Sequence, residues 1–277
     1  MAKISIMTMV FGGLLQKGAL NDTDMLQALG DMGYDGVEIP SGRLLDPPGR
    51  LKTYQDYLAG SPLQVTCIDG SCNFIGPDKA ARDAGIEALR AAIDAAVSLG
   101  APLVLAAGSQ ISGSITPEDG RRMIIEGLHA GLSVARKAGV ALAIENFGVA
   151  PTLQCAAAHC CEILEAVPGL RFVFDTGNFY FCGEDPIDNI TLLSSRTCHL
   201  HLKDWVKSEA PQIADVSGAP LGMGLIPNEE IVRRFLHAGQ VDCFSVEIEA
   251  PGDKIESARK DLGTVRQWLS DADTQGY

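Results

Sequence analysis

Short apolar runs alternate with longer amphipathic segments from one end of the 277-residue chain to the other. A short apolar run bounded by polar residues is typical of a buried strand, and an apolar stripe with helical spacing is typical of a covering helix. The pattern predicts strands at 4–10, 36–39, 64–68, 103–106, 141–145, 172–175, 198–203 and 244–248. The clearest helices are predicted at 78–99 and 117–138, the second with Thr116 as N-cap and Asp119 completing a capping-box-like pattern.

The eight strand–helix units take about 35 residues each, which suits a right-handed βα repeat closed into a barrel. We therefore predict an α/β protein with a single (β/α)8 TIM barrel at residues 1–270 and a polar tail at 271–277. A doubly wound open sheet is the alternative. It is disfavoured because the first strand is followed only by Gly12 and Gly13 and not by a phosphate-binding GxGxxG motif.

Composition and charge narrow the classes of partner. Hydrophobic residues make up 46% of the chain and charged residues 21%, as expected for a folded globular protein. The 35 acidic residues outnumber the 22 basic ones, which gives a formal net charge of −13. Such a charge repels phosphate backbones and anionic membranes, so we expect a small-molecule ligand and no nucleic-acid or membrane partner. A homo-oligomer is compatible with the sequence.

The cysteines and the apolar segments indicate a cytoplasmic protein. The eight cysteines fall mostly in apolar segments without paired CxxC spacing, which favours reduced core thiols over disulfides or a zinc cluster. The apolar stretch 4–15 contains Thr8, Gly12 and Gly13 and leads to no cleavage site, so we interpret it as a strand and a loop. No other stretch reaches the roughly 18 apolar residues that a membrane span needs.

The last four predicted strands carry polar residues on one face only. In the fifth strand, Leu142 and Ile144 share the face opposite to Glu145. The polar set on these strands comprises Glu145, Asp175, His199, His201, Lys203, Ser245, Glu247 and Glu249. With the large apolar residues packed against the helices, the polar residues face the barrel axis near the carboxyl ends of four successive strands.

Carboxylates that converge in a buried place must protonate or bind a cation. Glu145, Asp175, His201 and Glu247 supply oxygen and nitrogen ligands that suit Mn²⁺, Mg²⁺, Co²⁺ or Zn²⁺, so we predict one divalent metal ion held by these four residues. The alternative is that each acid pairs with a nearby Lys or Arg, although these strands contain few basic residues.

Three further inward positions are predicted to contact the substrate. Glu38, on the inner face of the second strand, would bind a substrate hydroxyl or make a structural hydrogen bond. His199 lies one layer deeper than His201, where a buried core imidazole is the alternative interpretation. Lys203 lies one layer nearer the opening and would contact a substrate oxygen or an enolate, or form a salt bridge with Glu249.

Several motifs in this order resemble a known family. They are GVEIP at 36–40, AIENFG at 143–148, FDTGNFYFCGEDP at 174–186, HLHLKDW at 199–205, LGMG at 221–224 and FSVEIEAPGD at 244–253. Together they resemble the sugar phosphate isomerase/epimerase superfamily, which has a xylose isomerase-like TIM barrel. Its members include ketose 3-epimerases, hydroxypyruvate isomerase, inosose dehydratase, dehydroshikimate dehydratase and endonuclease IV.

The resemblance implies the same four metal ligands, from the EN, DTGN, HLKD and VE motifs. It also implies that Glu145 and Glu247 act as an acid/base pair on opposite faces of a bound ketose. One position departs from the ketose 3-epimerases, which typically have a histidine where this chain has Asn178. Asn178 is retained as a predicted substrate-binding residue.

The predicted function is a metal-dependent isomerase or epimerase of a small sugar or polyhydroxy carbonyl compound, acting through an enediolate in carbohydrate metabolism, with manganese among the expected metals. A dehydratase or lyase of a keto-cyclitol or dehydroshikimate type is the alternative, because the same enolate can expel a hydroxyl group. An endonuclease IV-like phosphodiesterase would need further histidines, and the second to fourth strands contain none. A non-catalytic sugar-binding barrel would not need both glutamates.

Overall fold

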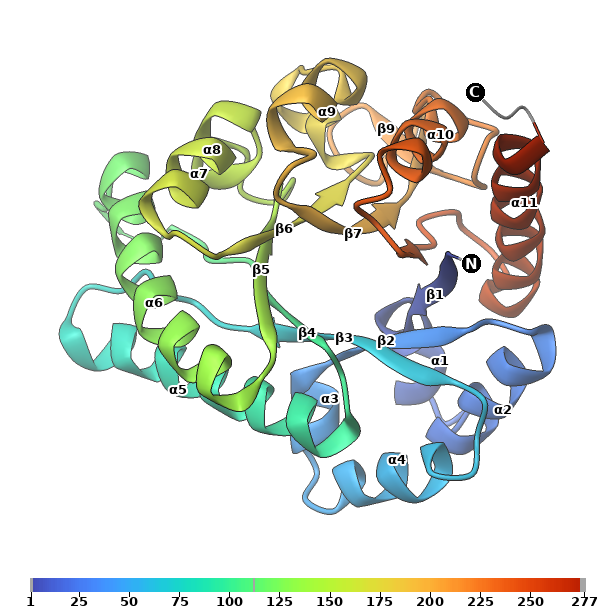
Figure 1. Cartoon of the computed structure of the whole chain (residues 1–277), viewed down its shortest axis with the longest axis horizontal. Coiled ribbons are helices and arrows are strands. Elements are labelled where there is room, and N and C mark those ends of the chain that lie inside the picture. The colour runs from blue at the N-terminus through green and yellow to red at the C-terminus, as the bar shows by residue number, and fades with distance from the viewer. Residues whose placement is uncertain (1, 112, 275–277) are drawn as a thin grey trace.

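A closed ring of eight parallel strands forms the centre of the molecule, with helices outside it (Figure 1). The computed structural model describes residues 2–111 and 113–274. Neighbouring strands follow the order β1-β10-β7-β6-β5-β4-β3-β2 around the ring. The predicted (β/α)8 barrel is therefore confirmed.

The barrel strands lie close to the predicted segments. Their bounds are β1 Lys3–Met7, β2 Gly36–Pro40, β3 Gln64–Ser71, β4 Leu103–Ala107, β5 Ala141–Glu145, β6 Arg171–Asp175, β7 Thr197–Leu202 and β10 Cys243–Val246. The first and last strands are shorter than predicted at their carboxyl ends, and β3 is three residues longer. A 3₁₀ turn at Thr8–Phe11 replaces the predicted end of β1.

The helices follow the strands in sequence. Their bounds are α1 Gly12–Gln16, α2 Asp22–Met32, α3 Ser41–Leu45, α4 Arg50–Leu58, α5 Lys79–Leu99, α6 Pro117–Ala138, α7 Pro151–Gln154, α8 Ala157–Ala166, α9 Pro186–Leu193, α10 Asn228–Ala238 and α11 Lys254–Thr274. At the start of α6, the Thr116 hydroxyl accepts a hydrogen bond from the Asp119 amide, as predicted. Gly100 and Gly139 end α5 and α6 in the left-handed conformation that favours glycine.

Two apolar layers confirm the alternation read from the sequence. The larger layer fills the space between strands and helices and includes Leu142, Ile144, Phe172 and Phe174. A smaller layer fills the barrel interior and consists of Cys67, Leu103, Leu105, Ala143 and Val173. Because side chains alternate along a strand, the residues two positions further on, including Asp69, Glu145 and Asp175, also face the interior, nearer the carboxyl ends.

A hairpin that the sequence pattern did not predict follows β7. Its strands β8 (Asp204–Lys207) and β9 (Val216–Ala219) pair antiparallel outside the barrel. The Asp204 carboxylate accepts hydrogen bonds from the backbone amides of Gly222 and Gly224, and also from two others. A Cβ atom at Gly224 would lie 2.2 Å from Asp204 Oδ1, so this turn needs glycine. The HLKD and LGMG motifs thus fold against each other.

Three further observations bear on the predictions. Helix α11 continues to Thr274, and the rest of the predicted tail, 275–277, lies outside the described residues. None of the described helices combines the length and hydropathy of a membrane-spanning segment. All eight cysteines are unpaired thiols.

Candidate metal and catalytic site

The four predicted metal ligands meet at the carboxyl ends of neighbouring strands. Glu145 ends β5, Asp175 ends β6 and His201 lies in β7, directly opposite Asp175 in the strand register. Glu247 follows β10 by one residue, and its backbone amide donates to Leu202 O at 2.9 Å, so it remains in register with β7. The parallel ladder therefore places three carboxylates around one imidazole.

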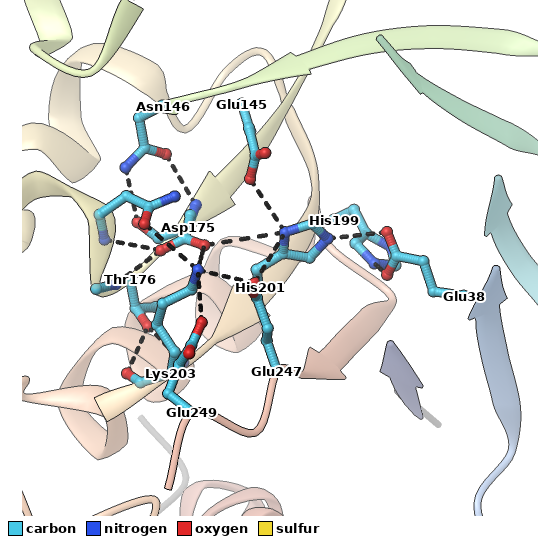
Figure 2. Close-up of polar contacts among 12 residues, drawn as sticks. Glu38, Glu145, Asn146, Asp175, Thr176, His199, His201, Lys203, Glu247 and Glu249 are labelled. Atoms are coloured by element: carbon cyan, nitrogen blue, oxygen red, sulfur yellow. Dashed lines mark hydrogen bonds and ion pairs between the residues drawn. The ribbon is translucent and has the colours of Figure 1, made fainter. Parts of the chain in front are cut away.

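The His201 imidazole lies at the centre of this cluster (Figure 2). Its Nδ1 atom faces the three carboxylates, at 3.2 Å from Glu145 Oε2 and 3.9 Å from both Asp175 Oδ2 and Glu247 Oε2. Its Nε2 atom lies 2.9 Å from Glu38 Oε1 on the other side of the ring. This second contact fixes the plane of the ring and turns Nδ1 toward the acids, as supporting carboxylates do for metal-binding histidines.

The Lys203 ammonium group lies among the same acids. Its Nζ atom is 2.9 Å from both Asp175 Oδ2 and Glu247 Oε2, and 3.8 Å from Glu249 Oε1. It also donates to Asn178 Oδ1 at 3.3 Å. The pairing with a basic residue that the sequence left open is thus present for Asp175 and Glu247, and Lys203 supplies the positive charge.

The backbone around Asp175 is held on both sides. The Asn146 side chain donates to Asp175 O and accepts from the Asp175 amide, both at 2.9 Å. Asp175 Oδ1 accepts from the amides of Gly177 and Asn178 at 2.9 and 2.8 Å. These contacts explain the Asn of the EN motif and the turn of the DTGN motif, and they leave Asp175 Oδ2 directed toward His201 and Lys203.

Burial and neighbouring charges shift the pKa values in opposite directions. Burial raises the pKa of Asp175 to about 7, and the nearby Glu247 and Glu145 carboxylates add to the shift against the opposing effect of Lys203. Burial also disfavours ionised Glu247, yet Lys203 and His201 hold its pKa below the ordinary value. Although burial lowers the pKa of His201, Glu38 and Glu145 raise it well above the usual range. These residues therefore form a network of buried, mutually dependent titratable groups.

The donor set fits a divalent cation. One ligand atom from each of Glu145, Asp175 and His201 can be chosen so that all three lie within 4.8 Å of one another. Asp175 Oδ2 is fully buried and has no hydrogen-bond partner, although the Lys203 ammonium is close. Glu247 adds a fourth ligand if its Oε2 exchanges the ammonium group for the ion. Buried carboxylates with one imidazole are a hard, mixed ligand set for Mn²⁺, Mg²⁺, Co²⁺ or Zn²⁺.

Glu38 and His199 lie beneath this cluster. Glu38 is completely buried, and its two carboxylate oxygens contact the Nε2 atoms of His201 and His199 at 2.9 and 3.0 Å. Neither residue lines the cavity described next. Their contacts favour the structural alternatives for both residues: Glu38 bridges two imidazoles and orients His201.

A cavity of about 570 Å³ opens above the acids. Four of the predicted residues line it: Glu145, Asn178, Lys203 and Glu247. Most of the remaining wall is apolar or aromatic and includes Met7, Met9, Pro40, Leu105, Ala107, Phe147, Val149, Phe181, Trp205 and Ile213. A substrate that bound here would reach both glutamates from the same enclosed space.

Asp69 and Trp205 are among the lining residues that the sequence did not predict. Asp69 lies on the inner face of β3, but the predicted strand ended at Ile68, so its place in the alternation was not considered. Trp205 lies in the unpredicted hairpin, where its Nε1 donates to Gly177 O at 3.1 Å. The alternation of polar and apolar residues would have found Asp69, whereas Trp205 depends on tertiary packing.

The family follows from a match over most of the chain. Residues 26–271 match the family model described as "Xylose isomerase-like TIM barrel". The chain therefore belongs to this family, as the sequence motifs predicted. No curated protein sequence matches the chain.

Solved structures share the fold at low sequence identity. A D-tagatose 3-epimerase-like protein superposes with a TM-score of 0.81 at 17% identity, covering 99% of each chain. The IOLI protein with a bound zinc atom gives 0.77 at 19% identity, also over 99% of each chain. AsbF of Bacillus anthracis, described as a probable 3-DHS dehydratase, gives 0.75 at 16% identity over 95% of this chain and 98% of that one. These likenesses establish the fold, and the neighbours include enzymes of more than one reaction class.

Proposed function

We propose that the protein is a divalent-metal-dependent isomerase or epimerase of a small, uncharged sugar or polyhydroxy carbonyl compound. The observation that carries the proposal is that Glu145 and Glu247 line one cavity and both approach the Nδ1 atom of His201. Two carboxylates that reach one bound molecule can remove a carbon-bound proton and return one. In this proposal, Glu145, Asp175, His201 and Glu247 hold the ion.

The proton transfer follows from the charges around the two glutamates. Lys203 and His201 lower the pKa of Glu247, which favours the ionised form that a base needs. As Glu247 takes the proton, the electrons of the carbon–hydrogen bond form a carbon–carbon double bond, and the carbonyl oxygen gains negative charge. The ion, when bound, supplies positive charge that stabilises this oxyanion. Glu145, carrying a proton taken up from solvent, delivers it to the other face for epimerisation, or to the neighbouring carbon for isomerisation. Isomerisation also moves the hydroxyl proton from one oxygen to the other, and Glu247 releases the abstracted proton to solvent.

The charge of the cavity supports an uncharged substrate. Four acids line the wall: Asp69, Glu145, Glu247 and Glu249. Among the described lining residues, Lys203 is the only Lys or Arg, and two carboxylates already contact it at 2.9 Å. A phosphate or carboxylate group would meet this negative field without a free basic partner. The charge therefore favours neutral ketoses and keto-cyclitols over dehydroshikimate, which carries a carboxylate.

The test is a substrate screen on metal-loaded protein with ketoses, keto-inositols and dehydroshikimate. With an active substrate in D₂O, we expect the product to keep its elemental formula and to gain carbon-bound deuterium, unless the base is shielded from solvent. Mass spectrometry that shows loss of water as the metal-dependent main reaction would assign the protein to the dehydratases.

Variants then test the acid/base pair. Glu145→Gln and Glu247→Gln should each lower turnover by about 100-fold or more, because general acid–base catalysis contributes factors of this size. Metal content is measured alongside, since either change also removes a charged ligand. Glu256→Gln, on the exposed face of α11, is the matched control. Near wild-type turnover in either site variant would remove that glutamate from the mechanism.

A further inference from the structure

The Asp69 carboxylate accepts no hydrogen bond from any donor among the described residues, and the one side chain whose hydrogen bonding contributes to its raised pKa is another acid, Glu38. Asp69 is 5% exposed, and both its side-chain oxygens are buried without a hydrogen bond. Among the described residues, Asp69 is the only one with two such side-chain atoms. A buried polar group without a partner destabilises a fold, so native structures seldom leave one without a functional reason.

Other buried aspartates of this chain accept hydrogen bonds from backbone amides. Asp204 accepts four backbone hydrogen bonds, and Asp175 accepts two while its second oxygen lies against Lys203. Asp261, on α11, accepts from the Leu221 amide at 3.1 Å. Asp69 differs from these because it is a residue of the cavity wall, at the carboxyl end of β3.

The position of Asp69 complements the metal and proton-transfer groups. In the closed strand order, β3 lies four places from β7 in either direction, so Asp69 is on the side of the barrel opposite to His201 and Lys203. A ligand that fills the cavity between them can contact both sides at once. The Asp69 side chain is then a polar contact on the wall that faces the acid–imidazole cluster, beside Ser71 of the same strand.

The chemistry of Asp69 suits a hydroxyl group. Burial and the negative charge of Glu38 raise the pKa of Asp69 well above its ordinary value, which favours the protonated acid. A protonated carboxyl group has both a donor and an acceptor, as a hydroxyl has, so the two can exchange hydrogen bonds. Glu38 makes the largest charge contribution to this shift and is within hydrogen-bonding reach of a protonated Asp69, while its two oxygens also contact His199 and His201.

We propose that Asp69 is a substrate-binding residue that hydrogen-bonds a hydroxyl group of the polyhydroxy substrate, on the wall opposite to β7. This inference rests on the proposed function, because it takes the cavity to bind such a compound. It adds a specificity contact that neither the metal ligands nor the acid/base pair supplies: a ligand with hydrogen in place of that hydroxyl would leave the carboxyl group without a partner.

The first test compares stability without substrate. Asp69→Leu removes a buried acid that lies against Glu38 and keeps the number of side-chain heavy atoms, so the thermal midpoint of the metal-loaded protein should stay unchanged or rise. Asp261→Leu, which removes a partnered buried carboxylate, should lower the midpoint and is the matched control. A fall for Asp69→Leu as large as that for Asp261→Leu would show a structural role and overturn the inference.

The second test measures ligand binding in a Trp268→Phe background, where fluorescence reports the remaining tryptophan, Trp205, in the cavity wall. D-fructose and myo-inositol serve as uncharged probes. We expect Asp69→Leu to weaken binding at least about tenfold and Asp69→Asn to weaken it less, because an amide keeps a donor and an acceptor. Equal affinity in wild type and both variants would overturn the role of Asp69 alone. No binding to the wild type, together with a failed substrate screen, would overturn the proposed function as well.

Discussion

Replacing Lys203 with methionine should unfold the metal-free protein far more easily than replacing an exposed lysine. The Lys203 side chain is 6% exposed and lies 2.9 Å from Asp175 and from Glu247. Methionine keeps much of the apolar volume but removes the charge. Without that charge, two buried carboxylates that already lie near a third would have to protonate or repel one another.

The magnitude follows from the two ion pairs. With an effective dielectric constant of about 20, each 2.9 Å pair contributes about 6 kcal/mol of Coulomb attraction before desolvation is subtracted. Desolvation of the three groups offsets most of this, and removing one partner of a buried pair lowers the free energy of unfolding by about 3–5 kcal/mol. Lys207 is paired with Asp215 where both side chains are about 60% exposed, so solvent screens the pair and its contribution to stability should be much smaller.

The assay is urea unfolding of wild type, Lys203→Met and Lys207→Met, each without metal and with excess Mn²⁺. If Asp175 and Glu247 are metal ligands, Mn²⁺ replaces the missing charge, and an excess of about 1,000 times its dissociation constant stabilises the folded state by about 4 kcal/mol. Lys203→Met should therefore gain more from Mn²⁺ than wild type, in which the ammonium group competes for the same oxygens. Equal losses in the two lysine variants would refute the buried-ion argument. A variant that Mn²⁺ does not stabilise would refute the ligand assignment.

Three further predictions concern the same site and its support. The pKa of Asp175 is raised to about 7, so a proton must leave this carboxyl group as the ion binds. Mn²⁺ affinity should therefore fall as the pH drops through about 7 and level off above it. Calorimetry that finds the same affinity at about pH 6 and at about pH 8 would contradict this. Asn146→Ala removes both hydrogen bonds between the Asn146 side chain and the Asp175 backbone. It should lower the free energy of unfolding by about 2–3 kcal/mol and weaken Mn²⁺ binding. A loss of stability without a loss of Mn²⁺ affinity would limit Asn146 to a structural role. Thr116→Ala removes the N-cap of α6 and should lower stability by about 1 kcal/mol in urea unfolding while metal affinity stays unchanged, since the cap lies outside the cavity.

The sequence by itself determined the barrel and the inward direction of the polar side chains. Alternation along a strand is a local property, so Leu142 and Ile144 against Glu145 already indicated which face packs on the helices. Parallel strands have their carboxyl ends at the same edge, so local alternation was enough to bring Asp175, His201 and Glu247 toward one place. The family motifs pointed to the same residues.

The tertiary structure decided which polar groups neutralise one another. Lys203 lies between Asp175 and Glu247. Glu38 contacts the imidazoles of both His199 and His201 across the barrel interior. These pairings depend on strand order and register, which the alternation of side chains along one strand does not encode. That Asp69 accepts no hydrogen bond from a neighbouring donor likewise emerges only once every neighbour is placed. Alternation reports the face on which a side chain lies, whereas hydrogen bonds and ion pairs depend on distances of a few ångströms between residues far apart in the chain.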